Sequence, residues 1–184
     1  MIYRLNLPNK ITIFRIFLLP LLVVFLITPS KLASFFAVII FGIASFSDWL
    51  DGHIARSTKQ VTTFGKFMDP IADKLLLIAA LVPLVEMDRA PAWMVVIIIC
   101  REFAVSGLRI INSSQGIVIQ ASSLGKYKMV AMITSIILLI LNYKIFFIDF
   151  HFLGMVGLWI ALIISIISGA DYFIKFFSFI DFES

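Results

Sequence analysis

The sequence predicts an all-α integral membrane protein with six transmembrane helices and a short interfacial segment at the N-terminus. Apolar residues make up 61% of the 184 residues, and only 14% are charged, whereas a soluble domain is nearer half apolar and a quarter charged. This balance excludes an ordinary water-soluble enzyme and also a disordered chain, which would be rich in charge. Six spans of about 20 residues each fit this length with short connections, which predicts a single membrane domain over residues 1–184.

The first three helices are predicted from apolar runs at residues 11–27, 32–46 and 71–85. Residues 2–10 mix apolar and polar side chains, and they are expected to lie in the membrane interface before the first span. Pro70 stands just before the third run. It is therefore expected in the first turn of that helix, where its missing N–H costs little.

The last three helices are predicted from apolar runs at residues 92–111, 129–141 and 152–167. Turn-forming residues precede each run. Several of the six runs are shorter than a bilayer span, so we expect helices that continue into the polar flanks.

The basic residues predict the orientation of the spans. With the N-terminus in the cytoplasm, Lys31, Arg89 and Lys144 lie outside, and the other 12 of the 15 Lys and Arg residues lie inside. This bias predicts a multi-pass protein of the cell (inner) membrane, with its N-terminus and active site on the cytoplasmic side. The net charge of +4 is better explained by contact with anionic membrane lipids than by nucleic acid, which is not expected as a partner.

Four aspartates flank the short polar link between the second and third predicted helices. Asp48 and Asp51 lie about one turn apart on one helix, and Asp69 and Asp73 share a face of the next. The short link makes the two helices antiparallel neighbours, so the carboxylates can converge at one depth. Four carboxylates in one pocket repel one another unless cations lie among them, and oxygen ligands suit Mg²⁺ or Mn²⁺. The alternative is a set of helix-end salt bridges with Arg56, Lys66 and Lys74.

The residues between these carboxylates are also informative. Gly52, Ala55 and Gly65 leave room for a ligand close to the backbone, and Arg56 can pair with a phosphate. Two metal ions held by carboxylates suit in-line phosphoryl transfer, because they neutralise phosphate oxygens and stabilise the leaving group.

The segment fits the pattern D-x2-D-G-x2-A-R-x8-G-x3-D-x3-D at every fixed position and gap. These positions are Asp48, Asp51, Gly52, Ala55, Arg56, Gly65, Asp69 and Asp73. The chain thereby resembles the CDP-alcohol phosphatidyltransferase family. The resemblance implies an enzyme that uses two Mg²⁺ or Mn²⁺ ions and replaces the CMP of a CDP-linked lipid by an alcohol. It also implies a homodimer.

The resemblance assigns roles within the motif. The first three aspartates are metal ligands by that likeness. Asp73 is the general base for the acceptor hydroxyl and also contacts a metal. The small residues and the arginine border the cytidine nucleotide; they are Gly52, Ala55, Arg56 and Gly65.

Basic residues of the fourth and fifth helices predict how the acceptor is recognised. Arg101 and Arg109 lie about two turns apart on one helix, and with Lys126 they can clamp a phosphate. Glu102 is expected to point away from its neighbour Arg101 and to orient another group. For Lys128, a basic patch touching anionic lipid is the alternative to a role in the site.

Three segments resemble the branch of the family that accepts glycerol 3-phosphate. They are Asn-Leu-Pro-Asn-Lys-Ile-Thr-Ile-Phe-Arg at 6–15, Arg-Glu-Phe-x-x-Ser-Gly-Leu-Arg at 101–109 and Gly-Lys-x-Lys at 125–128. This resemblance implies CDP-diacylglycerol and glycerol 3-phosphate as substrates. It places Asn9, Thr12 and Arg15 near the nucleotide and diphosphate, and Arg101, Arg109 and Lys126 at the acceptor phosphate.

Three other functions remain open on the sequence. The same chemistry with inositol, inositol phosphate or serine would be revealed by a panel of acceptors. A cation transporter or channel, with the aspartates as ion sites, predicts ion flux without release of CMP. A membrane scaffold predicts that all four aspartates tolerate replacement by Asn.

Overall fold

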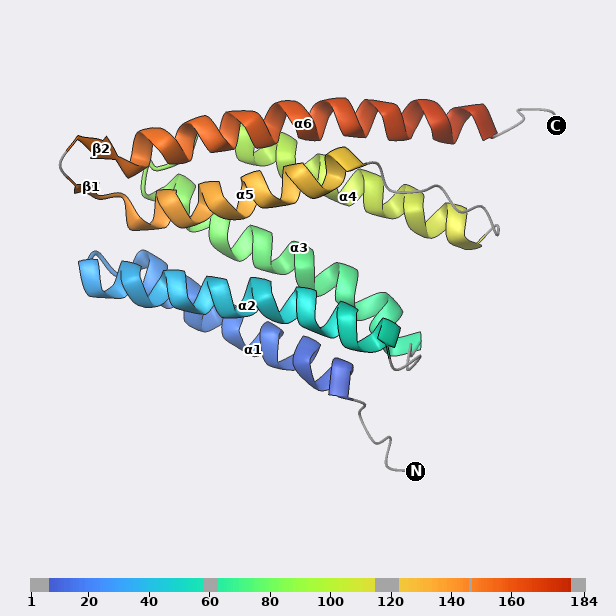
Figure 1. Cartoon of the computed structure of the whole chain (residues 1–184), viewed down its shortest axis with the longest axis horizontal. Helices are drawn as coiled ribbons and strands as arrows, with labels where there is room; N and C mark the ends of the chain where they lie inside the picture. Colours follow the sequence, from blue (N-terminus) through green and yellow to red (C-terminus); the bar gives the residue numbers. More distant parts are fainter. Residues whose placement is uncertain (1–6, 58–62, 115–122, 146, 180–184) are drawn as a thin grey trace. The chain divides into compact units, whose positions relative to one another are not determined.

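A computed structural model describes residues 7–57, 63–114, 123–145 and 147–179. At several helix ends only the backbone is described, and this applies to residues 48–57. The described residues form six helices and one short hairpin (Figure 1). The elements are α1 (Leu7–Ile27), α2 (Lys31–Ser57), α3 (Thr63–Glu86), α4 (Ala92–Ser114), α5 (Ser123–Leu141), β1 (Lys144–Ile145), β2 (Ile148–Asp149) and α6 (Phe150–Phe179).

Each predicted apolar run lies within one helix, and the helices continue into polar flanks as expected. The longest continuations take α2 to Ser57, α3 back to Thr63 and α6 to Phe179. Residues 7–10 of the predicted interfacial segment form the first turn of α1, and residues 1–6 lie outside the described part. The prediction of Pro70 in the first turn of its helix was wrong, because α3 begins at Thr63 and holds Pro70 in its interior.

The chain forms two compact units, one of residues 1–89 with 140–142 and one of residues 90–139 with 143–184. In the first unit α1 packs against both α2 and α3, and α2 also contacts α3 (Figure 1). The start of α1, the end of α2 and the start of α3 lie at the same end of this unit. The polar continuations of all three helices are therefore brought to one end.

Helix α1 has one buried face, which is polar near the start of the helix and apolar towards its end. Spacings of three and four residues place Asn9, Thr12, Arg15, Leu19, Leu22 and Leu26 on one face, and all six are buried. The leucines pack at one end of the helix, whereas the polar residues occupy the end where the aspartates of the motif lie. On α2 and α3 the fully buried positions include Ala37, Ala44, Ala72 and Ala80, and such small residues let helices approach closely in a membrane.

The second unit contains α4, α5 and α6, and its buried stripes also change from apolar to polar. On α5 the stripe is Lys128, Met132, Ser135 and Leu139, and on α6 it runs through Leu158, Ala161, Ser165 and Ser168. Gly154 lets these helices meet, because a Cβ there would lie 2.8 Å from Cγ of Leu139. Ser135 Oγ donates to the Gly154 carbonyl at 2.5 Å.

The hairpin between α5 and α6 departs from the predicted all-α fold. Its two strands have two residues each, too few to leave a periodic signal in the sequence. Lys144 pairs with Asp149 across the strands, with 2.9 Å between Nζ and Oδ2. Asp149 Oδ1 also accepts from the backbone N–H groups of His151 and Phe152, which caps α6. The bond from Lys144 and these backbone donors lower the pKa of Asp149, and the bond to Asp149 raises that of Lys144.

Two described helical stretches, Asn9–Ile27 and Phe150–Phe177, are long and apolar enough to cross a membrane, and Lys31–Ser47 is a shorter apolar stretch. The face of α1 opposite its buried stripe carries exposed apolar side chains, among them Phe14, Phe17, Leu21 and Val24. A water-soluble surface rarely shows such a continuous apolar face, so lipid is its natural environment.

Candidate functional site

The polar end of the first unit joins α1 to α3 through a hydrogen bond. Thr12 Oγ1 donates to Asp69 Oδ1 at 2.8 Å. Thr12 is fully buried and Asp69 is half-buried, so the bond orients one carboxylate oxygen and leaves the other to a ligand. The bond arises because the polar half of the α1 stripe faces the start of α3. Asn9 and Arg15, predicted near the nucleotide, lie buried on the same stripe.

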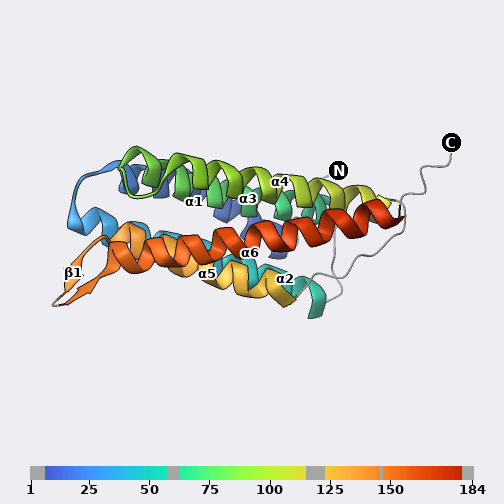
Figure 2. The same ribbon diagram turned by 90° about the horizontal axis from the view of Figure 1, so that it is seen from above.

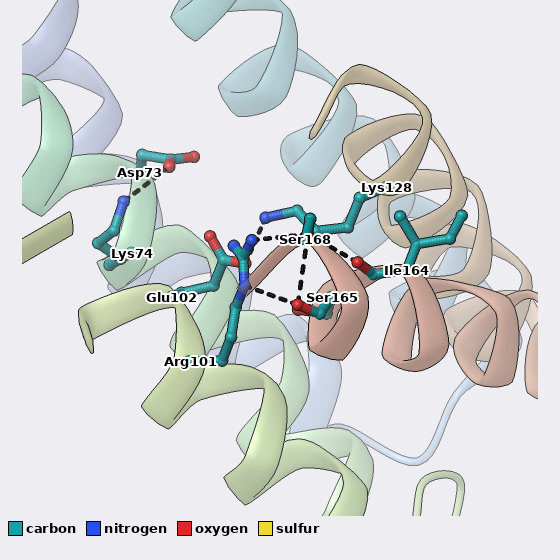
Figure 3. Close-up of polar contacts among 8 residues, drawn as sticks. All are labelled: Asp73, Lys74, Arg101, Glu102, Lys128, Ile164, Ser165 and Ser168. Atoms are coloured by element: carbon teal, nitrogen blue, oxygen red, sulfur yellow. Dashed lines mark hydrogen bonds and ion pairs between the residues drawn. The ribbon is translucent and has the colours of Figure 1, made fainter. Parts of the chain in front are cut away.

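Asp73 lies one turn after Asp69 on the same face of α3, as predicted. Lys74 Nζ contacts Asp73 Oδ2 at 3.3 Å, and the side chain of Asp73 is 38% exposed while that of Lys74 is 11% exposed (Figure 3). A contact this long leaves the Asp73 carboxylate accessible. The salt-bridge alternative is therefore realised for Lys74, though in a weak form.

The other motif residues lie on the last turns of α2 and the first turns of α3. The α2 backbone is helical through Asp48, Asp51, Gly52, Ala55 and Arg56, so the predicted helical spacing is present. The side chains of these five residues lie outside the described ones. Gly65 is buried near the start of α3. Because α2 and α3 contact each other and run antiparallel (Figures 1 and 2), the two halves of the motif belong to neighbouring helices.

The donor chemistry of this end fits a hard divalent cation. Asp69 and Asp73 offer carboxylate oxygens from one helix face, and the Thr12 hydroxyl already orients one of them. Oxygen-only donors suit Mg²⁺ and Mn²⁺. No group of three or more acidic, His or Cys side chains gathers among those described; Asp48 and Asp51 are outside that set.

A second polar cluster lies inside the second unit. Arg101 Nη1 donates to Glu102 Oε1 at 2.9 Å, and Lys128 Nζ also donates to this carboxylate oxygen (Figure 3). The expectation that Glu102 points away from Arg101 was wrong, because its carboxylate accepts from Arg101. The expectation that Glu102 orients another group was confirmed, because the same carboxylate accepts from Lys128. The side chains of Arg101, Glu102 and Lys128 are only 14%, 15% and 10% exposed. The alternative of a lipid-facing patch does not apply to Lys128, which is buried.

The three predicted acceptor-binding residues are placed differently within this unit. Arg101 belongs to the cluster in the middle of α4. Arg109 lies farther along α4, and Lys126 lies in the first turn of α5; both are exposed. These two cations are accessible to a water-soluble anion, whereas Arg101 is held by α6 and by Glu102 of its own helix.

Two serines of α6 that were not predicted to be functional also contact Arg101. Ser168 Oγ accepts from Arg101 Nη2 at 2.7 Å, and the backbone carbonyl of Ser165 accepts from Arg101 Nε at 2.9 Å. A signal was present, because Ser165 and Ser168 are polar residues three apart at the end of an apolar run. Their spacing gives a helix face, but it does not identify an arginine on α4 as the partner.

Comparison with known proteins extends over nearly the whole chain. The profile of the CDP-alcohol phosphatidyltransferase family matches residues 5–167. A protein of Bacillus subtilis (strain 168), the CDP-diacylglycerol–glycerol-3-phosphate 3-phosphatidyltransferase, is 44% identical over 92% of this chain and 94% of its own length. Proteins with the same description are similar in Rickettsia felis, at 37% identity over 91% and 93% of the two chains, and in Haemophilus influenzae, at 36% over 92% of each.

Proposed function

The chain belongs to the CDP-alcohol phosphatidyltransferase family, and from this premise we infer that it transfers the phosphatidyl group of CDP-diacylglycerol to glycerol 3-phosphate. The products are phosphatidylglycerophosphate and CMP. The observation that carries this function is the similarity over more than nine-tenths of the chain to relatives described as enzymes of this reaction. The protein is a membrane enzyme of phospholipid biosynthesis.

The reaction needs a base near the attacking hydroxyl. We assign this role to Asp73, whose partly exposed carboxylate is contacted only loosely by Lys74. The primary hydroxyl oxygen of glycerol 3-phosphate forms a bond to the phosphorus that carries the diacylglycerol. The bond from that phosphorus to the CMP oxygen breaks, CMP leaves with that oxygen, and the hydroxyl proton passes to Asp73.

Asp48, Asp51, Asp69 and Asp73 are the residues that would hold two divalent ions, Mg²⁺ or Mn²⁺. Bound there, the ions would neutralise phosphate oxygens and stabilise the leaving CMP. The contribution of the protein is orientation, because Thr12 holds one oxygen of Asp69 in place. Such support of a ligating carboxylate is typical of metal sites.

The remaining predicted site residues divide between the lipid donor and the acceptor. We assign Asn9, Thr12 and Arg15 to the nucleotide and diphosphate side, and this is supported by their shared buried stripe on α1. Gly52, Ala55, Arg56 and Gly65 border the cytidine. Arg101, Arg109 and Lys126 bind the acceptor phosphate, and this is supported by the accessibility of the last two.

We further propose that all six helices cross the inner membrane with the N-terminus and the active site on the cytoplasmic side. The distribution of Lys and Arg supports this orientation. The lipid donor then enters from the leaflet, and the polar acceptor comes from water. A homodimer is proposed from the family resemblance.

The test is release of CMP by the purified protein in detergent with CDP-diacylglycerol, Mg²⁺ or Mn²⁺, and a panel of acceptors. We expect CMP and phosphatidylglycerophosphate with glycerol 3-phosphate, and no release after chelation of the metal. Consumption of serine, inositol or inositol phosphate in place of glycerol 3-phosphate would overturn the assigned acceptor. Ion flux in liposomes without any release of CMP would overturn the enzymatic function.

A further inference from the structure

Three residues of α6, Ser165, Ser168 and Gly169, form a seat for the guanidinium of Arg101. The Ser165 carbonyl accepts from Arg101 Nε at 2.9 Å, and Ser168 Oγ accepts from Nη2 at 2.7 Å (Figure 3). Gly169 completes the seat, because a Cβ at this position would lie 3.1 Å from Nε and 3.2 Å from Cγ of Arg101. The α6 seat thus fixes Arg101 by two hydrogen bonds and by close contact.

The hydroxyl of Ser168 has a defined orientation. Ser168 Oγ donates its one hydrogen to the Ile164 carbonyl at 2.6 Å, and the Ser165 carbonyl is farther away at 3.3 Å. A hydroxyl has a single donor and two lone pairs. Because the donor is used within α6, the lone pairs are left to accept from Arg101, which only donates.

The opposite side of Arg101 is held by Glu102, which also accepts from Lys128. An arginine has five N–H donors. Within the described part of the chain, three N–H donors of Arg101 have acceptors. One of these donors is on Nε, one on Nη1 and one on Nη2. Among the described residues, one donor on each terminal nitrogen has no acceptor and is available to a ligand, and the guanidinium that carries these donors is already immobilised.

We propose that Ser168 and Gly169 are positioning residues, which hold Arg101 so that its two remaining donors bind the phosphate of a phosphomonoester acceptor. The inference rests on the proposed function, in which Arg101 binds glycerol 3-phosphate. A free arginine would lose side-chain entropy when it closes on an anion, whereas a seated arginine has already lost it. Two N–H donors on separate nitrogens also match the oxygens of a phosphate.

The test is the kinetics of Ser168→Ala in the full-length protein, with glycerol 3-phosphate varied at saturating CDP-diacylglycerol. We expect the KM for glycerol 3-phosphate to rise about tenfold, since loss of one hydrogen bond to a charged group loosens Arg101 by that order. The kcat and the KM for CDP-diacylglycerol should change little. Ser168→Thr keeps the hydroxyl and should restore the KM.

Ser135→Ala is the matched control, because it removes a buried hydroxyl of the same unit that bonds Gly154 and not Arg101. It should leave the KM for glycerol 3-phosphate unchanged. Gly169→Ala would place a methyl group against the side chain of Arg101 and displace it. This variant should raise the KM for glycerol 3-phosphate, and it provides a second test if Ser168→Ala fails to fold.

An unchanged KM in both Ser168→Ala and Gly169→Ala would overturn the positioning role. Failure of the proposed function looks different. In that case the wild-type protein itself does not consume glycerol 3-phosphate, whatever the residue at position 168.

Discussion

Each of the two units contains a cluster of polar side chains, and the two clusters are satisfied differently. In the first unit, Thr12 orients Asp69. The side chain of Asp73, one turn later, is 38% exposed, and Lys74 Nζ lies 3.3 Å from its Oδ2. In the second unit, Arg101, Glu102 and Lys128 are each at most 15% exposed and are joined by one shared carboxylate. The first cluster has a carboxylate open to a ligand, whereas the charged side chains of the second cluster are paired with one another.

This difference shows how charge within an apolar helix should be interpreted. A charged side chain in a membrane helix is costly and therefore needs a partner. Where protein groups supply the partner, as α6 does for Arg101, the main effect of the charged side chain is to link two helices. Where a carboxylate is only loosely contacted, as Asp73 is, the partner can be a ligand. Changes in the first unit should therefore affect turnover, and changes in the second should affect stability and acceptor binding.

The largest expected effect is on turnover and comes from Asp73→Asn. Loss of the general base should lower kcat by about 10²–10⁴-fold while the protein remains folded. The measurement is the rate of CMP release, together with thermal unfolding followed by circular dichroism. Asp171→Asn is the control, because Asp171 forms an exposed pair with Lys175 at 2.7 Å, and it should retain normal turnover. Normal turnover in Asp73→Asn would refute its role as the base.

The next effect is on stability and comes from Glu102→Gln in the second unit. Removal of one partner from a buried ion pair costs about 3–5 kcal/mol, because the remaining charges stay buried. Glu102 bridges two cations, so the midpoint of thermal unfolding should fall clearly. Asp171→Asn breaks an exposed pair and should change stability by less than about 1 kcal/mol. Equal midpoints for the two variants would mean that the cluster does not hold its unit together.

A smaller effect is expected from Thr12→Val, which removes the hydrogen bond to Asp69 but keeps the shape of the side chain. Groups that support a metal ligand are worth about 10–100-fold in metal affinity or activity. The Mg²⁺ or Mn²⁺ concentration that gives half-maximal release of CMP should rise accordingly. Thr12→Ser keeps the hydroxyl and should behave like the wild type. If the valine variant needs no more metal than the wild type, Thr12 does not orient Asp69 for a cation.

The smallest effect is expected in the hairpin, outside both polar clusters. The pKa of Asp149 is lowered by its bonds to Lys144 and to the backbone at Phe152. Its charge therefore adds stability that is present above the ordinary value of 3.8 and is lost as pH falls through the lowered value. Asp149→Asn keeps a capping oxygen and removes only the charge. The variant should be slightly less stable than the wild type at neutral pH and equal to it in strong acid. A difference that persists in acid would show that the charge is not its source.

Much of the fold follows from local patterns in the sequence. The apolar runs located all six helices, and the spacing of Asp69 and Asp73 placed them on one face, because the period of a helix is independent of its neighbours. Pro70 shows the limit of this reasoning. The mixed polar and apolar residues before it, from Thr63 onward, are helical although the apolar run starts after them.

The sequence by itself determined the order of the helices, the motif and the family to which the chain belongs. Only the tertiary structure decided which polar groups meet, as in the bond from Thr12 to Asp69 and the seating of Arg101 on Ser168. The physical reason is that periodicity defines the face on which a side chain lies. The partner on another helix depends on how far the two helices slide and turn when their small residues pack together.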